Sequence, residues 1–223
     1  MKIHGIDPSR VKAAVFDLGG VILAGGVENV EQFGIDLGLT EETWADMRRE
    51  LFLQPGWWDR LERGEMALDD FAGELVRRMG GAGIALSLDR ARNFMSHPGD
   101  NHGMPVRAEI VAAAKAIHAA MPTALLTNNI REWRSAWRAR INVDALFDTV
   151  IDSSEVGMRK PEERIYAYSE EKIGLRGDEL FFVDDLGMNL KPARARGWQT
   201  LTYGETADVL EVLHALTDGR PQR

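Results

Sequence analysis

Short apolar runs that end abruptly in polar residues recur along the chain. Three of them are continuously apolar, which is typical of strands buried on both faces of a parallel sheet. These three span residues 13–17, 124–129 and 180–185. Two further runs that predict strands span residues 147–152 and 198–203. Helical patterns lie between the strands, over residues 105–120, 131–140 and 161–173. This alternation predicts an α/β fold with a Rossmann-like, doubly wound parallel sheet.

The stretch from residue 25 to residue 104 breaks this rhythm, because it holds helical patterns and no convincing buried strand. Residues 43–52 form an amphipathic run, and apolar residues recur at helical spacing at Leu68, Phe71, Leu75, Val76 and Met79. We therefore expect a helical cap at 25–104, inserted into a core made of residues 1–24 and 105–223. The insertion point places the cap over the carboxyl edge of the sheet, where ligands bind in such folds. The polar tail after Leu216 is expected to fray.

Composition narrows the classes of function. The 223 residues are 44% hydrophobic and 28% charged, which suits a soluble chain with a full core. The formal net charge of −8 disfavours nucleic acid as a partner, because phosphate backbones repel it. The absence of cysteine excludes disulfides, thiolate catalysis and cysteine-ligated metals. No secretory signal and no run of about 20 apolar residues is present. We expect a cytoplasmic monomer or homodimer that does not bind membranes.

Asp17 is the first candidate for chemistry. It ends the first predicted strand and is followed by Gly19 and Gly20, which let a ligand approach the main chain. A carboxylate in this place is well positioned to attack an electrophile. A residue that only caps a turn would also fit the local pattern.

Other polar residues follow the remaining buried strands. Adjacent carboxylates at Asp184 and Asp185 repel each other unless a cation neutralises them, and oxygen ligands of this kind suit Mg²⁺. Thr127 and Asn128 offer a hydroxyl, an amide and main-chain N–H groups to phosphate oxygens. Lys160, before a proline that opens a predicted helix, offers an ammonium. Taken singly, these residues also fit a helix cap, a turn and a surface lysine. Taken together they gain weight, because a parallel sheet brings its carboxyl strand ends to one edge.

The order of these motifs resembles the haloacid dehalogenase superfamily. The matching segments are VFDLGGVI, LLTNN, RKPEERIY and FFVDDLGMNLKPARARGWQTL. The last segment is similar to the phosphatase-like amino-terminal domain of soluble epoxide hydrolases. The resemblance implies that Asp17 forms an aspartyl-phosphate, that Thr127 binds the phosphoryl group and that Lys160 steadies the charges. It also implies that Mg²⁺ is held by Asp17, Asp184, Asp185 and the main-chain carbonyl of Gly19. The implied substrate is a small phosphorylated metabolite.

Position 19 departs from the pattern of this superfamily. Typical phosphatases of the superfamily carry there a second aspartate, which acts as general acid and base, and this chain carries Gly19. The carbonyl that binds the metal is kept, but the proton donor is lost. Members with Asp-Leu-Gly resemble sugar-1-phosphate phosphatases and are expected to be active. We therefore expect a preference for good leaving groups, such as those of sugar 1-phosphates.

Three alternatives follow from the missing aspartate. Phosphonatases use a cap lysine, and residues 25–104 contain none, so this branch is rejected. Haloacid dehalogenases use an aspartate without metal and lack the paired carboxylates, so Asp184 and Asp185 argue against them. The third alternative is a phosphate-binding regulatory module that has lost catalysis.

Aromatic and histidine residues receive structural interpretations. Trp133 and Trp137 lie at helical spacing and are expected to pack. Trp57, Trp58 and Arg60 would either belong to an interface or to the core, which we favour, or face the substrate from a loop. His97 and His102 flank a turn near the point where the chain returns from the cap to the core. We expect them to act as hinge residues.

Overall fold

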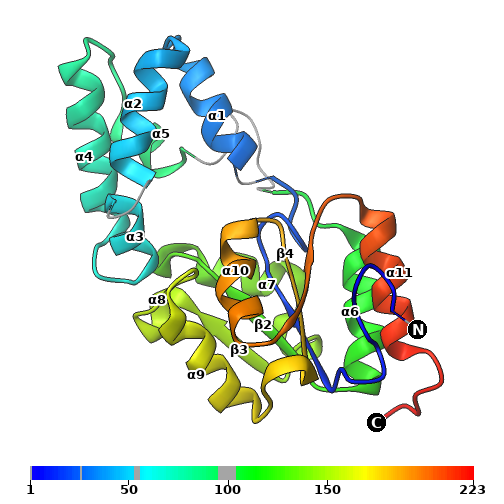
Figure 1. Cartoon of the computed structure of the whole chain (residues 1–223). Coiled ribbons are helices and arrows are strands. Elements are labelled where there is room, and N and C mark those ends of the chain that lie inside the picture. Colours follow the sequence, from blue (N-terminus) through cyan, green and yellow to red (C-terminus); the bar gives the residue numbers. More distant parts are fainter. Residues whose placement is uncertain (1, 26, 53–55, 95–103) are drawn as a thin grey trace.

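The computed structural model describes residues 2–25, 27–52, 56–94 and 104–223 (Figure 1). His97 and His102 lie outside the described residues, so their expected hinge role stays a prediction. Within the described ranges, no helix is both long enough and apolar enough to cross a bilayer.

A five-stranded parallel sheet forms the centre of the fold, in the order β3-β2-β1-β4-β5. The strands are β1 (Ala13–Phe16), β2 (Thr123–Thr127), β3 (Thr149–Asp152), β4 (Leu180–Asp184) and β5 (Gln199–Thr202). All five coincide with the apolar runs that predict strands, so the α/β fold class is confirmed. The chain builds outward from β1 to β3 and then returns to place β4 on the other side of β1. The carboxyl ends of β1, β2 and β4 are therefore neighbours.

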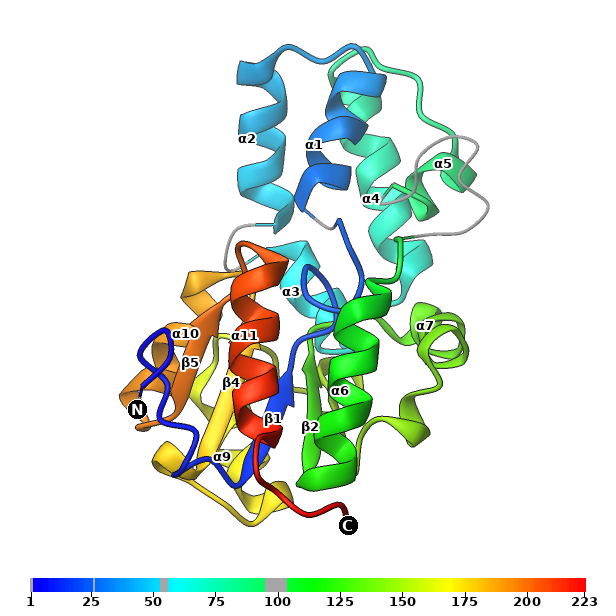
Figure 2. The same ribbon diagram turned by 90° about the vertical axis from the view of Figure 1, so that its right-hand side faces the viewer.

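Helices cover both faces of the sheet. The helices and turns of this part are α6 (Ala108–Ala120), α7 (Arg134–Ile141), α8 (Ser153–Val156), α9 (Glu163–Ile173), α10 (Gly187–Ala195) and α11 (Thr206–Thr217), with the 3-10 turns η1 (Arg131–Trp133), η2 (Val143–Ala145) and η3 (Gly177–Glu179). Ala14 and Phe16 of β1 pack towards α6, α7 and α11, whereas Ala13 and Val15 pack towards α9 and α10. Alternate residues of one strand thus serve two cores. In both views α6 and α11 lie side by side (Figures 1 and 2).

Three helices of this part, α8, α10 and α11, were not expected from the sequence, and α8 has only four residues. Pro192 lies inside α10 and Gly187 begins it, and both residues weaken a helical pattern. In α11 the pattern was available, because Val209, Val212, Leu213 and Leu216 are buried at helical spacing. The tail after α11 is also corrected. Arg220 donates to the main-chain carbonyls of Pro8 and Val11, so the end of the chain is held and not frayed.

The described part of the segment between β1 and α6 contains five helices and no strand. Its helices are α1 (Val27–Asp36), α2 (Glu41–Phe52), α3 (Trp57–Glu62), α4 (Leu68–Gly81) and α5 (Leu88–Arg92). They share a core of their own, which includes Phe33, Leu51, Phe71 and Leu75. They lie beyond the end of β1 at which the chain leaves the sheet (Figures 1 and 2). We call this helical segment the cap. Its predicted boundaries at residues 25 and 104 stay predictions.

The cap meets the core through α3, which packs against α8. Trp57, Trp58 and Arg60 belong to this helix, so the loop assumed in the substrate-facing alternative is wrong. Trp58 lies in an aromatic cluster with Phe71 and Phe94 of the cap and with Trp133 of the core, at ring-centroid distances of 5.7, 5.5 and 6.2 Å. The interpretation of Trp58 as a residue of the interface between cap and core is confirmed.

The other tryptophans also pack. Trp57 lies partly buried against the core of the cap, with the guanidinium of Arg60 5.8 Å from the centre of its ring. Trp137 is buried among the core helices, and Trp133 contacts both cores. The packing role predicted for Trp133 and Trp137 is therefore confirmed.

Candidate active site at the carboxyl edge of the sheet

Three carboxylates meet where β1 and β4 end. Asp17 follows β1 and donates its main-chain N–H to the carbonyl of Val183 in β4 at 3.0 Å. Asp184 ends β4, and Asp185 follows it. One carboxylate oxygen from each of Asp17, Asp184 and Asp185 lies within 4.8 Å of the others. The structure thus brings together residues that are more than 160 positions apart in the sequence.

Lys160 places its ammonium between two of these carboxylates. Its Nζ lies 2.8 Å from Oδ1 of Asp17 and 2.7 Å from Oδ2 of Asp184. The side chain is 1% exposed, so these ion pairs are shielded from water. The expected meeting of Lys160 with the strand-end aspartates is therefore observed in the geometry.

The charges of the cluster are unbalanced. Three carboxylates against one ammonium leave a net charge of −2 when all are ionised. Burial raises the pKa of the Asp17 carboxyl well above its ordinary value; the charges of Asp184 and Asp185 add to this, and Lys160 offsets part of it. Burial also opposes the charge of Lys160, but Asp17 and Asp184 outweigh it and raise the pKa of the ammonium. A buried excess of negative charge costs several kcal/mol per ion. The donor set therefore fits a divalent, oxygen-seeking cation such as Mg²⁺.

Asp184 is held by donors from the protein itself. Its Oδ1 accepts from the main-chain N–H of Leu186 at 2.8 Å and from Nδ2 of Asn189 at 3.0 Å, and its Oδ2 accepts from Lys160. Asn189 is buried in α10, and the hydroxyl of Tyr166 donates to its carbonyl at 2.5 Å. Sequence reasoning missed Asn189, although an amide five residues after the strand end was a usable signal. Both oxygens of Asp184 are thus supplied with donors by the protein itself.

Gly19 and Gly20 differ in their surroundings. A Cβ built on Gly20 would overlap the carboxylate of Asp185, and Gly20 has a φ of +74°, which favours glycine. Among the described residues other than its chain neighbours, a Cβ built on Gly19 would meet no heavy atom within 4 Å. The turn therefore requires glycine at position 20, whereas position 19 has space for a side chain.

Thr127 ends β2, the other neighbour of β1, and Asn128 follows it. Thr127 is 1% exposed, and its hydroxyl makes a long hydrogen bond of 3.3 Å to the carbonyl of Asn128. The amide of Asn128 is paired with the main chain of Lys160: Nδ2 donates to its carbonyl at 2.9 Å, and Oδ1 accepts from its N–H at 2.8 Å. The side chain of Asn128 thus holds the lysine in place.

Arg107, another residue that the sequence did not single out, grips the turn after Asp17. Its Nη1 donates to the carbonyls of Gly20 at 2.7 Å and Val21 at 3.1 Å, and its guanidinium stacks on Tyr203 at 4.5 Å. It lies at the start of α6, more than 80 residues from the turn that it holds. No local pattern marks such a contact.

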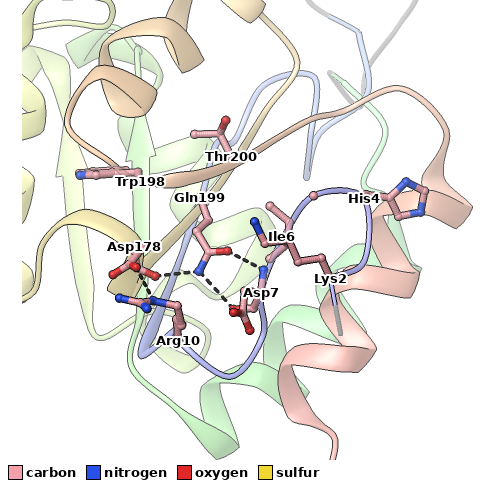
Figure 3. A pocket seen from close by; sticks show the side chains of 10 residues that line it. Lys2, His4, Ile6, Asp7, Arg10, Asp178, Trp198, Gln199 and Thr200 are labelled. Carbon is pink, nitrogen blue, oxygen red and sulfur yellow. Dashed lines mark hydrogen bonds and ion pairs between the residues drawn. The ribbon is translucent and has the colours of Figure 1, made fainter.

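A separate pocket of about 540 Å³ lies at the amino end of β5 (Figure 3). The residues around it are bound to one another. Gln199 accepts from the N–H of Asp7 at 2.6 Å and donates to the carbonyl of Asp178 at 2.8 Å, and Arg10 pairs with Asp178. Because it opens at the amino end of the strand, we do not assign it to the carboxylate cluster.

The sequence matches the haloacid dehalogenase-like hydrolase family over residues 11–197. It is 27% identical to bifunctional epoxide hydrolase 2 of Rattus norvegicus over 93% of this chain and 39% of that protein. The chain thus spans about two fifths of the length of this relative. It is also 27% identical to sesquiterpene phosphatase astK of Aspergillus oryzae, over 83% of this chain and 86% of that protein.

Solved structures share the fold. A family enzyme of Bacteroides thetaiotaomicron, in complex with magnesium and inorganic phosphate, has a TM-score of 0.65 and 22% identity over 88% of this chain and 96% of its own. An L-2-haloacid dehalogenase of Xanthobacter autotrophicus has a TM-score of 0.61 and 19% identity over 91% and 88%. This chain therefore shares its fold both with an enzyme solved with magnesium and phosphate and with a dehalogenase, and the fold does not distinguish between them.

Proposed function

Because this chain belongs to the haloacid dehalogenase-like hydrolase family, we propose that it is a Mg²⁺-dependent phosphatase that cleaves phosphoric monoesters of small metabolites through Asp17. The observation that carries the proposal is the cluster of three carboxylates, two of them buried and paired with a single ammonium and the third half-buried beside them. A dehalogenase needs no metal and gains nothing from an excess of buried negative charge. A phosphatase needs a cation there, because it must bring a phosphate dianion to a carboxylate.

The first chemical step is attack of a carboxylate oxygen of Asp17 on phosphorus. A bond forms between that oxygen and phosphorus, and the bond from phosphorus to the leaving oxygen breaks, which gives an aspartyl-phosphate and an alkoxide that takes a proton from solvent to become the alcohol. Lys160 neutralises part of the negative charge shared by Asp17 and the phosphoryl group. In the second step, water attacks phosphorus and gives up a proton to solvent, the bond between phosphorus and Asp17 breaks, inorganic phosphate leaves, and the carboxylate of Asp17 is regenerated.

Asp17, Asp185 and the carbonyl of Gly19 would hold Mg²⁺, with Asp184 acting directly or through water. When bound, the ion neutralises the cluster and polarises the phosphoryl oxygens. Thr127 supplies its hydroxyl to the phosphoryl group. Asn128 contributes through its main-chain N–H, because its amide is paired with Lys160. The loop that begins at Gly19 and Gly20 completes the site that binds the phosphoryl group.

The leaving group must depart without an acid at position 19. In the part of the chain that the structure describes, no side chain reaches within 4 Å of a Cβ built on Gly19, which supports this. We therefore assign a preference for esters whose leaving group is already acidic, such as sugar 1-phosphates, acyl phosphates and aryl phosphates.

The test is a phosphate-release screen over small phosphorylated metabolites, with and without Mg²⁺ and with Asp17→Asn as the blank. Metal-dependent turnover that is absent from the variant supports a phosphatase. Halide release from 2-haloacids in the presence of chelator would instead establish a dehalogenase. Phosphate binding without turnover of any ester would establish the regulatory module.

A further inference from the structure

Arg159, the residue before Lys160, is a buried cation that joins the core to the cap. Its Nε lies 2.6 Å from Oε2 of Glu62, and its Nη1 lies 2.7 Å from Oδ1 of Asp59. Both acids belong to α3 and lie one helical turn apart. The three residues are 8%, 5% and 2% exposed, in the order Arg159, Glu62 and Asp59. These three charged residues therefore form ion pairs that are buried between the core and the cap.

A second ion pair binds the loop that carries Lys160, at a residue that follows the lysine. Nη1 of Arg63, the residue after α3, lies 3.0 Å from Oε1 of Glu162. Two carboxylates of the cap thus bind Arg159, which precedes Lys160. A guanidinium of the cap binds Glu162, which follows Lys160. Gly64 continues this contact, because a Cβ there would overlap the main-chain carbonyl of Ser154. The end of α3 and the turn after it lie directly on the core.

The core holds Lys160 from the opposite side. The amide of Asn128 pairs with both polar groups of its main chain, and Asp17 and Asp184 pair with its ammonium. The neighbours of the lysine in the sequence are therefore fixed by the cap, while the lysine itself is fixed by the strand ends. A shift of α3 would move the loop that carries the ammonium.

Stability alone is a weak reason for such a contact. Two carboxylates share one guanidinium, and burial raises the pKa of Glu62 although Arg159 lies beside it. Buried ion pairs often contribute no more stability than apolar residues of similar size. They do impose direction, because a guanidinium with two carboxylate partners fixes both position and orientation.

We propose that Arg159 is a positioning residue, through which α3 of the cap holds the ammonium of Lys160 in register with Asp17. This inference rests on the proposed function of Lys160. Loosening α3 from Arg159 slows transfer of the phosphoryl group to Asp17 and leaves substrate binding nearly intact. The cap thereby contributes to the rate, in addition to any contact it makes with the substrate.

The experiment compares Asp59→Asn, Glu62→Gln and the double variant with wild type. The matched control is Asp69→Asn, which neutralises an exposed cap aspartate that pairs with Arg92. We measure kcat and KM for p-nitrophenyl phosphate at saturating Mg²⁺, and amide hydrogen exchange of peptides covering residues 157–166. We expect the double variant to lose on the order of ten- to a hundredfold in kcat, as for a small misplacement of a catalytic group. We expect KM to stay within about threefold, exchange in this peptide to speed up, and the control to match wild type.

Lys160→Met distinguishes a failure of the proposed function from a failure of the positioning role given to Arg159. If this variant keeps wild-type activity, the role given to the lysine in the proposed function is wrong. If it is inactive while the folded double variant keeps wild-type kcat, the proposed function stands and the positioning inference is overturned. Should the double variant not fold, Glu62→Gln decides alone, because glutamine is neutral and keeps an acceptor for Arg159.

Discussion

Gly20 lies against the carboxylate of Asp185, in the place where any side chain would overlap it. The turn after Asp17 and the loop after β4 therefore fit together only because position 20 has no Cβ. Its left-handed φ of +74° gives a second reason for glycine.

Gly20→Ala is expected to weaken Mg²⁺ binding, because the new methyl group displaces Asp185. We expect a loss of about 10- to 100-fold in affinity, the range seen when groups around a metal site are disturbed. Isothermal titration calorimetry with Mg²⁺ measures it. The control is Gly38→Ala: Gly38 has a similar φ of +70°, and a Cβ there would meet none of the described residues beyond its chain neighbours within 4 Å. Equal Mg²⁺ affinities in the two variants would contradict the fit between Gly20 and Asp185.

Asp17→Asn is expected to lower turnover by about a thousandfold or more, as removal of other nucleophiles does. The fold should be kept, since asparagine has nearly the same shape. Without metal, the melting temperature should stay equal or rise, because burial raises the pKa of Asp17 and its charge therefore costs stability at neutral pH. Phosphate release and thermal melts in chelator test both parts. Retained wild-type turnover would refute the assignment of Asp17 as nucleophile.

Removal of Mg²⁺ is expected to abolish activity, and re-addition should restore it. The affinity for Mg²⁺ should fall as the pH falls through the raised pKa of Asp17, because the ion binds the deprotonated carboxylate. The measurement is activity against Mg²⁺ concentration at several pH values. Asp185→Asn should shift this titration to higher Mg²⁺ and provides the matched variant. Undiminished activity after exhaustive chelation would point to the dehalogenase branch.

Gly19→Asp is expected to help poor leaving groups more than good ones, because it adds a proton donor where the structure has space. The measurement is kcat/KM for wild type and variant across phosphate esters of graded leaving-group pKa. Wild type should show the steeper dependence. A burst experiment identifies the limiting step. A flat wild-type series, with phosphorylation limiting kcat/KM, would mean that another group donates the proton.

Glu170→Gln is expected to destabilise the core without touching the site. Glu170 accepts from Arg196 at 2.6 Å and from Nε1 of Trp198 at 2.8 Å, which ties α9 to the start of β5. Burial alone would raise the pKa of Glu170, but these donors outweigh it and lower the pKa below its ordinary value. The contribution of this carboxylate is therefore present above its unfolded pKa and is lost as the pH falls through its folded pKa.

We expect Glu170→Gln to lower the free energy of unfolding by about 1 kcal/mol at pH 7, and by less in acid. Urea unfolding at pH 7 and at pH 4 measures the difference. Glu171→Gln, the exposed neighbour on the same helix, serves as the control. A loss that is as large at pH 4 as at pH 7 would rule out the charge as its cause.

The sequence alone determined the sheet and the residues at its edge. Buried parallel strands require continuous apolar runs, and such a sheet delivers its carboxyl ends to one place. Asp17, Thr127 and Asp184 were therefore identifiable from the point at which each apolar run ended. The helical character of the segment before β2 followed in the same way, from the spacing of Leu68, Phe71 and Leu75.

Only the tertiary structure decided which charged residues are buried and what they bind. The helix α3 has six residues, too few for a clear periodic pattern, and its Asp59 and Glu62 read as surface charges in the sequence. Their partner Arg159 lies 100 and 97 positions away. A charged side chain is stable in the interior only beside an opposite charge, and chain folding, not local pattern, brings that charge to it. For the same reason the pairing of Asn128 with Lys160 and of Asn189 with Asp184 became visible only once the strand ends had met.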